Sequence, residues 1–383
     1  MNVDRSTPVS RRGLLLGIGA LGAAGALSSC SPPPSGASSG GSSSGGDWAA
    51  ATSAEAGGGM DALVAAAKAE GQLNVIALPP DWANYGAIIT AFGDKYGIKV
   101  SSDQPDASSQ DEINAVKQLG TTSRAPDTLD VGMSVALANT DLFAPYQVAT
   151  WADIDAAQKE PTGLWVQDYG GYMAVGYDSS KFPALTSLED LMGSAFKNSV
   201  ALNGDPTQAN AALNGVVMAA LASGGSADDV QPGIDFFARL KQAGNFIPVQ
   251  ATSATVVSGE TPVVFDWDYL AAANATQVPS WKVFVPSGAV LGGYYAQAIN
   301  KNAPHPAAAR LWQEFLYSDE GQNLWLAGGA RPVRMPAMEE AGSVDAAAAA
   351  KLPQVQGTPV FLTDAQATAA KSTVAANWAG AIA

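Results

Sequence analysis

The chain has 383 residues, a formal net charge of −15, one cysteine and one histidine. Nucleic acids and anionic membrane surfaces favour clusters of Lys and Arg, so this charge balance argues against both as partners. A single cysteine excludes a disulfide within the chain. With His305 as the only histidine, the sequence shows neither the ligand spacing of a zinc site nor the pattern of a Ser-His-Asp triad.

The N-terminal residues have the layout of an export signal. Arg5, Arg11 and Arg12 precede an uncharged, mostly apolar run over 13–27. A basic segment followed by an apolar run shorter than the roughly 20 residues of a membrane span is typical of a signal peptide. The residues over 10–16 resemble the twin-arginine signal, with Leu16 where that pattern usually has lysine. Export by the general route therefore stays open.

Cys30 closes the sequence Leu-Ser-Ser-Cys, which resembles the bacterial lipoprotein box. In that pattern the chain is cleaved before the cysteine, which then receives lipid, and more than one acyl chain is enough for stable anchoring. We therefore predict a signal peptide over 1–29 and a lipid anchor on Cys30, at the outer face of the cytoplasmic membrane. An ordinary signal peptide with a chance cysteine is the alternative. The Ser-, Gly- and Pro-rich residues 30–46 predict a flexible tether.

The remaining roughly 335 residues are more than one hydrophobic core usually serves, so two lobes are expected. Apolar spacing and Gly or Pro punctuation predict an alternation of strands and helices, which is typical of an open parallel sheet. The predicted helices cover 60–70, 82–96, 111–119, 134–138, 210–221, 234–243 and 307–317, with another helix beginning near 318–322. The predicted strands cover 73–78, 98–100, 128–133, 172–177, 200–202, 261–266, 281–285 and 293–299.

Four segments carry a resemblance to a known family. They are Ala-Pro-Asp-Thr-Leu-Asp-Val over 125–131, the strand exit over 176–182, the helix start over 185–191, and the Ala-Pro-rich block over 303–322. Leu188 stands where the family often has tryptophan. With these motifs the span from about Leu73 to Arg334 resembles the type II periplasmic binding proteins. More narrowly, it is similar to the extracellular solute-binding family that serves ferric-ion, polyamine, thiamine and phosphonate importers.

The resemblance implies an α/β fold of two lobes, with mostly parallel sheets flanked by helices and a ligand cleft between the lobes. Lobe one would combine 47–172 with 293–383, and lobe two would cover 173–292. It also implies a monomeric binding protein, not an enzyme and without a cofactor, that passes a small solute to an ABC permease and its ATPase. A ligand sensor is a second reading, and an exported glycoside hydrolase is a remote one.

Ligands of open α/β sheets bind beyond the carboxyl ends of the strands, which selects four loops and the returning strand. The candidate ligand-binding residues there are Asp81, Trp82, Ser134, Asp205, Thr207, Asp266, Trp267, Asp268 and Tyr295. Two of the loops place a carboxylate beside a tryptophan, whose face attracts cations. This predicts a cationic amine, such as a polyamine or a quaternary or thiamine-like compound. The alternative is that the carboxylates cap helices and the tryptophans fill the core.

Two other ligands stay open. Iron-binding relatives use adjacent tyrosines, and Tyr294 and Tyr295 are adjacent, but successive side chains of a strand point to opposite faces. The ferric alternative is therefore weaker, and no metal-ligating residues are predicted. A phosphonate or another anion could bind the backbone N–H groups of helix N-termini near Ser134 and Thr207.

Overall fold

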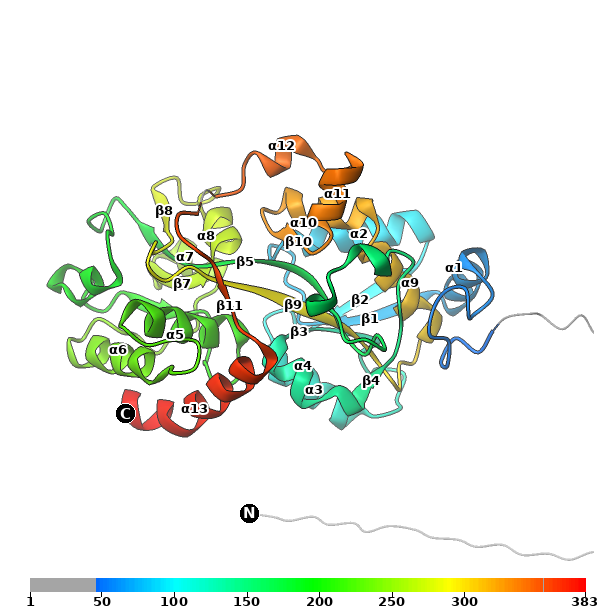
Figure 1. Cartoon of the computed structure of the whole chain (residues 1–383), viewed down its shortest axis with the longest axis horizontal. Coiled ribbons are helices and arrows are strands. Elements are labelled where there is room, and N and C mark those ends of the chain that lie inside the picture. Colours follow the sequence, from blue (N-terminus) through cyan, green and yellow to red (C-terminus); the bar gives the residue numbers. More distant parts are fainter. Residues whose placement is uncertain (1–45, 354) are drawn as a thin grey trace, which may run out of the picture. The chain divides into compact units, whose positions relative to one another are not determined.

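Two long strands organise the computed structural model, which describes residues 46–353 and 355–383 (Figure 1). They are β5 (Val166–Asp178) and β9 (Leu291–Asn300), and they pair antiparallel. Both strands are buried along nearly their whole length, as their apolar and glycine-rich sequences require. The predicted signal peptide, the lipid anchor on Cys30 and, apart from Gly46, the predicted tether lie outside the described residues.

One group of elements gathers at the C-terminal end of β9. The strands β3 (Thr128–Gly132) and β4 (Phe143–Ala144) pair antiparallel with β9. A two-stranded parallel sheet of β1 (Gln72–Ile76) and β2 (Lys99–Asp103) lies beside them (Figure 1). The helices of this part are α1 (Met60–Glu70), α2 (Tyr85–Tyr96), α3 (Ser109–Leu119), α4 (Met133–Ala138) and α9 (Pro306–Leu316).

A second group gathers at the C-terminal end of β5. There β5 pairs antiparallel with β7 (Val263–Trp267) and with β8 (Trp281–Phe284), and β6 (Val200–Leu202) extends the sheet parallel to β7. The helices of this part are α5 (Asn210–Ala222), α6 (Gln231–Gln242), α7 (Ser253–Ser258) and α8 (Asp268–Asn274).

The predicted two-lobed α/β fold is confirmed, but the expectation of mostly parallel sheets was wrong. Parallel pairing is found for β1 with β2, for β6 with β7, and for β9 with a short strand near the C-terminus. All pairs between β5 or β9 and their remaining neighbours are antiparallel. The reason is that β5 and β9 are the strands on which the other strands pair, they run in opposite directions, and β3, β4, β7, β8 and β10 (Arg331–Pro332) also run against the strand that they pair with. The lobe boundaries at 172/173 and 292/293 stay a prediction.

The C-terminal residues add elements that the sequence pattern did not predict, apart from α10 (Asp319–Ala327), which begins where a helix was expected near 318–322. The strand β10 (Arg331–Pro332) pairs with β5, and β11 (Val360–Phe361) pairs with the start of β9. The helices α10 (Asp319–Ala327), α11 (Met335–Ala341) and α12 (Ala346–Ala349) precede the final helix α13 (Asp364–Ile382). Helix α13 contacts α6, α5 and α4 (Figure 1). Within 46–353 and 355–383, no helix has the length and apolar character to cross a bilayer.

Four glycines lie where β5 and β9 cross, namely Gly170, Gly171, Gly292 and Gly293. A Cβ atom on Gly170 would lie 2.2 Å from the carbonyl oxygen of Gly293, and one on Gly293 would lie 2.7 Å from the Trp267 ring. The absence of side chains therefore lets the two backbones approach at the point that connects the lobes.

We expect Gly170→Ala to destabilise the protein by about 1–3 kcal/mol, because the added methyl group must displace backbone and overpacking of that kind costs this much. The free energy of unfolding from urea titration is the measurement. Gly288→Ala is the matched control, since no heavy atom lies within 4 Å of its added Cβ. Equal stability of the two variants would contradict the close approach at the crossing.

Candidate functional site

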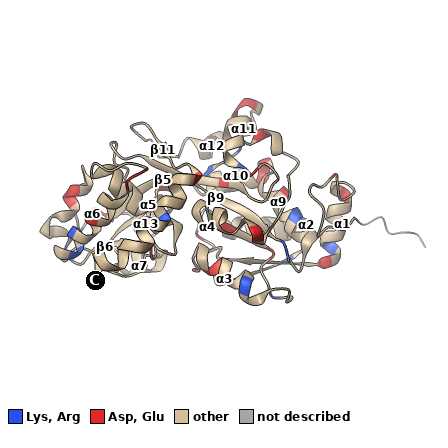
Figure 2. Cartoon of the chain, turned by 60° about the horizontal axis from the view of Figure 1, so that its bottom comes forward, with Lys and Arg blue, Asp and Glu red and all other residues tan. Residues whose placement is uncertain are grey.

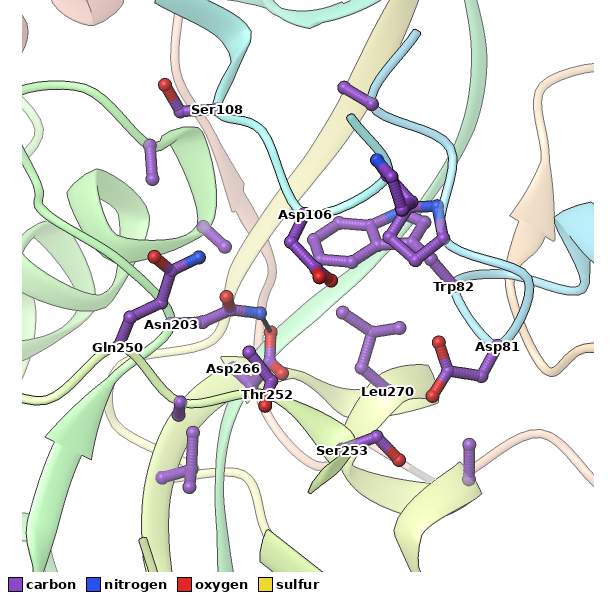
Figure 3. A pocket seen from close by; sticks show the side chains of 18 of the residues that line it. Asp81, Trp82, Asp106, Ser108, Asn203, Gln250, Thr252, Ser253, Asp266 and Leu270 are labelled. Carbon is purple, nitrogen blue, oxygen red and sulfur yellow. Dashed lines mark hydrogen bonds between the residues drawn. The ribbon is translucent and has the colours of Figure 1, made fainter. Parts of the chain in front are cut away.

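A cavity of about 200 Å³ lies between the two groups of elements (Figure 3). One wall consists of the loop that follows β1, the residues that lead into α3, and Asp130 of β3. The other wall consists of Asn203 after β6, the start of α5, the loop over 250–253, and parts of α7, β7 and α8. Tyr295 of β9 completes the lining. The cavity thus lies at the carboxyl ends of β1, β6 and β7, where ligands of α/β sheets bind.

The cavity lining is acidic. Five carboxyl side chains line it, those of Asp81, Asp106, Glu112, Asp130 and Asp266, and no Lys, Arg or His is among the described residues that line it. Figure 3 shows Asp81, Asp106 and Asp266 with Trp82 around the same space. A low-dielectric cavity with charges of one sign attracts the opposite charge, which here is positive.

Hydrogen bonds fix Trp82 and Asp130 relative to each other. Asp130 Oδ2 accepts hydrogen bonds from the hydroxyls of Tyr85 and Tyr169, both at 2.8 Å. The Tyr169 hydroxyl in turn accepts from Trp82 Nε1 at 2.7 Å, and the Tyr85 hydroxyl accepts from Gln297 Nε2 at 2.9 Å. The aromatic face and the carboxylate are therefore held in place before any solute arrives, which lowers the ordering cost of binding.

Tyr295 and Tyr294 point to opposite faces of β9. The Tyr295 ring meets Trp82 edge-on at 5.7 Å between centroids and lines the cavity, whereas the Tyr294 ring stacks with Phe361 at 6.3 Å. The adjacent tyrosines therefore do not both reach the cavity, which weakens the ferric alternative. Within 46–353 and 355–383 no three His, Cys, Asp or Glu side chains are grouped so as to hold a metal ion.

Burial changes the protonation of the deeper carboxyls. It raises the pKa of Asp130 to about 7, although the Tyr85 and Tyr169 hydroxyls favour the ionised form. Burial also raises the pKa of Asp266 to about 7, against the hydrogen bond that Asn203 Nδ2 donates at 3.0 Å. The pKa of Glu112 is raised well above its usual value by burial and by the nearby Asp130. A bound cation would favour the ionised forms of Asp130 and Asp266.

The family of the chain follows from comparison with known proteins. The family model of bacterial extracellular solute-binding proteins matches residues 127–356, which is more than half of the sequence. The chain belongs to the bacterial extracellular solute-binding protein family. It is therefore a substrate-binding protein of an ABC-transporter family, and membership implies export.

Solved structures show the same fold as this solute-binding protein at low sequence identity. Fructose-6-phosphate-bound AfuA from Actinobacillus pleuropneumoniae has a TM-score of 0.63 and 14% identity, over 81% of this chain and 98% of that chain. Iron-bound HitA from Pseudomonas aeruginosa has a TM-score of 0.56 and 20% identity, over 79% of this chain and 97% of that chain. The spermidine/putrescine-transporter protein PotD from Streptococcus pneumoniae has a TM-score of 0.52 and 16% identity, over 82% of this chain and 99% of that chain. These likenesses show the two-lobed fold, and the molecules bound in these structures differ from one to the next.

The solute-binding protein brings together four of the nine candidate residues. Asp81, Trp82, Asp266 and Tyr295 line the cavity. Their contact with a ligand stays a prediction. The other five candidates lie outside the lining.

Three of those five, Ser134, Asp205 and Thr207, lie at or just before the start of a helix. Ser134 is buried in the first turn of α4. Asp205 is exposed, and its Oδ1 accepts hydrogen bonds from the backbone N–H and the hydroxyl of Thr207, both at 2.8 Å. The two residues thus form a turn before α5 in which the polar groups of Thr207 are bonded to Asp205.

The other two, Trp267 and Asp268, are fully buried. Trp267 packs in the core and donates to the Tyr295 hydroxyl at 3.3 Å. Asp268 forms an ion pair with Arg331 at 2.8 Å and accepts the backbone N–H groups of Tyr172 and Tyr269. The Asp268 carboxylate is therefore already engaged by groups of the protein, which favours a structural role, and its contact with a ligand stays a prediction.

The sequence interpretation missed Asp106, Glu112 and Asp130, and it selected the loop that begins with Asn203 without naming Asn203 as a ligand-binding residue. Asp106 and Asn203 lie in loops that carry no aromatic neighbour in sequence. Asp130 had a usable signal, since a carboxylate between Leu129 and Val131 interrupts a buried strand. Buried carboxyls need a compensating partner, so such an interruption is informative.

Proposed function

We propose that this solute-binding protein captures a small cationic amine outside the cytoplasmic membrane and delivers it to an ABC permease and its ATPase. The observation that carries the proposal is the lining of five carboxyls with no basic side chain among the described residues, beside the Trp82 ring. An aromatic face together with carboxylates is the arrangement that binds ammonium groups. Binding without turnover, a monomeric state and a lipid anchor on Cys30 belong to the same proposal.

An anionic solute is the second candidate, and one observation favours it. Residues 209–211 at the start of α5 line the cavity, and α5 has no side-chain cap on its first N–H groups. Such N–H groups and the helix dipole attract anions. The carboxyls of the lining oppose an anion wherever they are ionised, and no basic side chain among the described residues of the lining offsets them, so the cation is the better supported ligand.

A thermal-shift screen of the purified full chain tests the proposal. The panel contains putrescine, spermidine, thiamine, choline, a phosphonate, ferric ion and a sugar phosphate. A ligand at a hundredfold excess over its Kd should stabilise the protein by about 2.7 kcal/mol. We expect amines to raise the Tm and the anions to leave it unchanged. A shift with the phosphonate or the sugar phosphate alone would contradict the proposal and favour the second candidate.

We expect Trp82→Leu to weaken binding of the amine that the screen identifies by about 5- to 30-fold, because a desolvated cation–π contact contributes about 1–2 kcal/mol. Isothermal titration calorimetry gives the affinity. Trp151→Leu is the control, since Trp151 is a half-buried tryptophan outside the cavity lining. Equal affinities of the two variants would exclude Trp82 from the binding surface.

A further inference from the structure

Asn203 and Asp266 form a hydrogen-bonded pair on the cavity wall at the ends of β6 and β7. The two strands run parallel with Leu202 opposite Phe265, so the next residues, Asn203 and Asp266, lie side by side at the carboxyl edge of the sheet. Asn203 Nδ2 donates to Asp266 Oδ1 at 3.0 Å (Figure 3). Both residues line the cavity.

The hydrogen bonds of Asp266 fix which way the Asn203 amide is turned. Asp266 Oδ1 also accepts the backbone N–H of Trp267 at 2.8 Å, so this oxygen is an acceptor and needs a donor opposite it. The Asn203 group that faces it must therefore be the amide nitrogen. The Asn203 carbonyl oxygen is consequently left without a role in holding Asp266.

Two acceptor atoms of this pair have no donor. Within 46–353 and 355–383, no group donates to Asp266 Oδ2 or to Asn203 Oδ1, and neither atom is among the enclosed ones, so each keeps accessible surface. The described residues of the lining include no Lys, Arg or His that could donate to them. A solute in the cavity can therefore reach both acceptors.

We propose that Asn203 is a positioning and specificity-determining residue: it holds the Asp266 carboxylate in place, and the captured cation donates N–H groups to Asp266 Oδ2 and to Asn203 Oδ1. This inference rests on the proposed capture of a cationic amine and narrows it to cations that carry N–H groups, such as a primary or secondary ammonium, an amidinium or a guanidinium. A quaternary ammonium carries the same charge and can contact the Trp82 ring, but it has no N–H for either acceptor.

Isothermal titration calorimetry on the full chain tests this inference with putrescine and its fully N-methylated counterpart. We expect putrescine to bind at least about 10-fold more tightly, since charge-assisted hydrogen bonds contribute about that much. Asn203→Leu keeps the approximate size of the side chain and removes its donor and its acceptor. In this variant the preference for putrescine should fall by at least about threefold.

The pH dependence of putrescine binding tests the positioning of Asp266. The hydrogen bond from Asn203 favours the ionised form of Asp266, whose pKa burial raises to about 7, so losing this bond raises that pKa further. The cation binds the ionised form. In Asn203→Leu the affinity should therefore reach its plateau about one pH unit higher than in the unchanged protein.

The other titratable groups near Asp266 are the same in this variant. They are Tyr269 of α8, Tyr295 of β9 and the remaining carboxyls of the lining, those of Asp81, Asp106, Glu112 and Asp130. Gln250→Leu is the control, because it changes an exposed amide of the same lining that is not bonded to Asp266. This variant should keep the pH at which the affinity reaches its plateau.

The outcomes separate the two proposals. Equal binding of putrescine and its methylated form overturns the inference while cation capture stands, and so does an unchanged preference in Asn203→Leu. A lower preference with an unchanged plateau pH overturns the positioning of Asp266 by Asn203. Failure of both compounds to bind contradicts the capture of amines and the inference with it. The comparison of the two ligand forms on the unchanged protein needs no variant, so the inference can fail even if Asn203→Leu does not fold.

Discussion

The affinity for the cationic amine is expected to rise about 100-fold between about pH 6 and about pH 8. Burial raises the pKa of both Asp130 and Asp266 to about 7. A cation binds the ionised carboxylates, so protons compete with it below that pH. Each carboxyl that must ionise contributes about tenfold over this interval, and the amine itself stays charged because its pKa is about 10.

Calorimetric titrations across this pH range, each repeated in two buffers of different ionisation enthalpy, measure the affinity and the protons released. Asp266→Asn removes one of the two titrating groups, so its affinity should rise only about tenfold over the same interval. The carboxylate of Asp178 is a useful control, because its hydrogen bonds with Ser180 and Ser280 lower its pKa to about 2. Asp178→Asn should keep the full pH dependence. A flat profile in the unchanged protein would show that neither cavity carboxyl ionises on binding.

The sequence predicted most regular elements because their apolar spacing is strong. The helix predicted over 210–221 is observed as Asn210–Ala222, for example. The helix predicted from Trp82 begins only at Tyr85, because Ala83 and Asn84 have φ of 45° and 69° and form a left-handed turn. That turn is what leaves Trp82 in a loop at the cavity.

Other elements carry too weak a pattern to be predicted. β5 begins at Val166, six residues before the predicted strand, because Gln167, Asp168 and two glycines interrupt the apolar pattern. Asp168 is nevertheless buried, and it accepts from Gln297 at 3.0 Å. The final helix α13 is rich in alanine and has no apolar stripe, so only its contacts with distant helices account for its position.

The candidate site shows the same limit. The rule that ligands bind beyond strand ends found Asp81 and Trp82, in the loop that follows β1, and Asp266, near the end of β7. It could not find the network of Asp130, because Tyr85 and Tyr169 are 45 and 39 residues away in sequence and meet Asp130 only in the folded chain. Two aspartates that are close in sequence also have different environments. Asp266 lines the cavity, whereas Asp268 is buried and forms an ion pair with Arg331.

Asp268→Ala is expected to destabilise the protein by about 3–5 kcal/mol, because it leaves the Arg331 guanidinium largely buried without its counter-ion. The Arg331 side chain is 15% exposed and that of Asp268 is fully buried, with 2.8 Å between Nη1 and Oδ2. The variant also removes the acceptor of two backbone N–H groups, those of Tyr172 and Tyr269. The free energy of unfolding from urea titration is the measurement.

The double variant Asp268→Ala with Arg331→Met separates the buried charge from the lost packing. It should recover part of the stability, because removing both charges of a buried pair costs less than removing one. Asp266→Asn is the matched single variant. Asp266 has no ion-pair partner among the described residues, and asparagine keeps the shape of its side chain. This variant should therefore lower the amine affinity and leave the free energy of unfolding unchanged. If Asp268→Ala instead keeps the free energy of unfolding of the unchanged protein and loses amine binding, Asp268 would be a ligand-binding residue, as the sequence alone predicted. Its ion pair between α8 and β10 would then contribute little to stability.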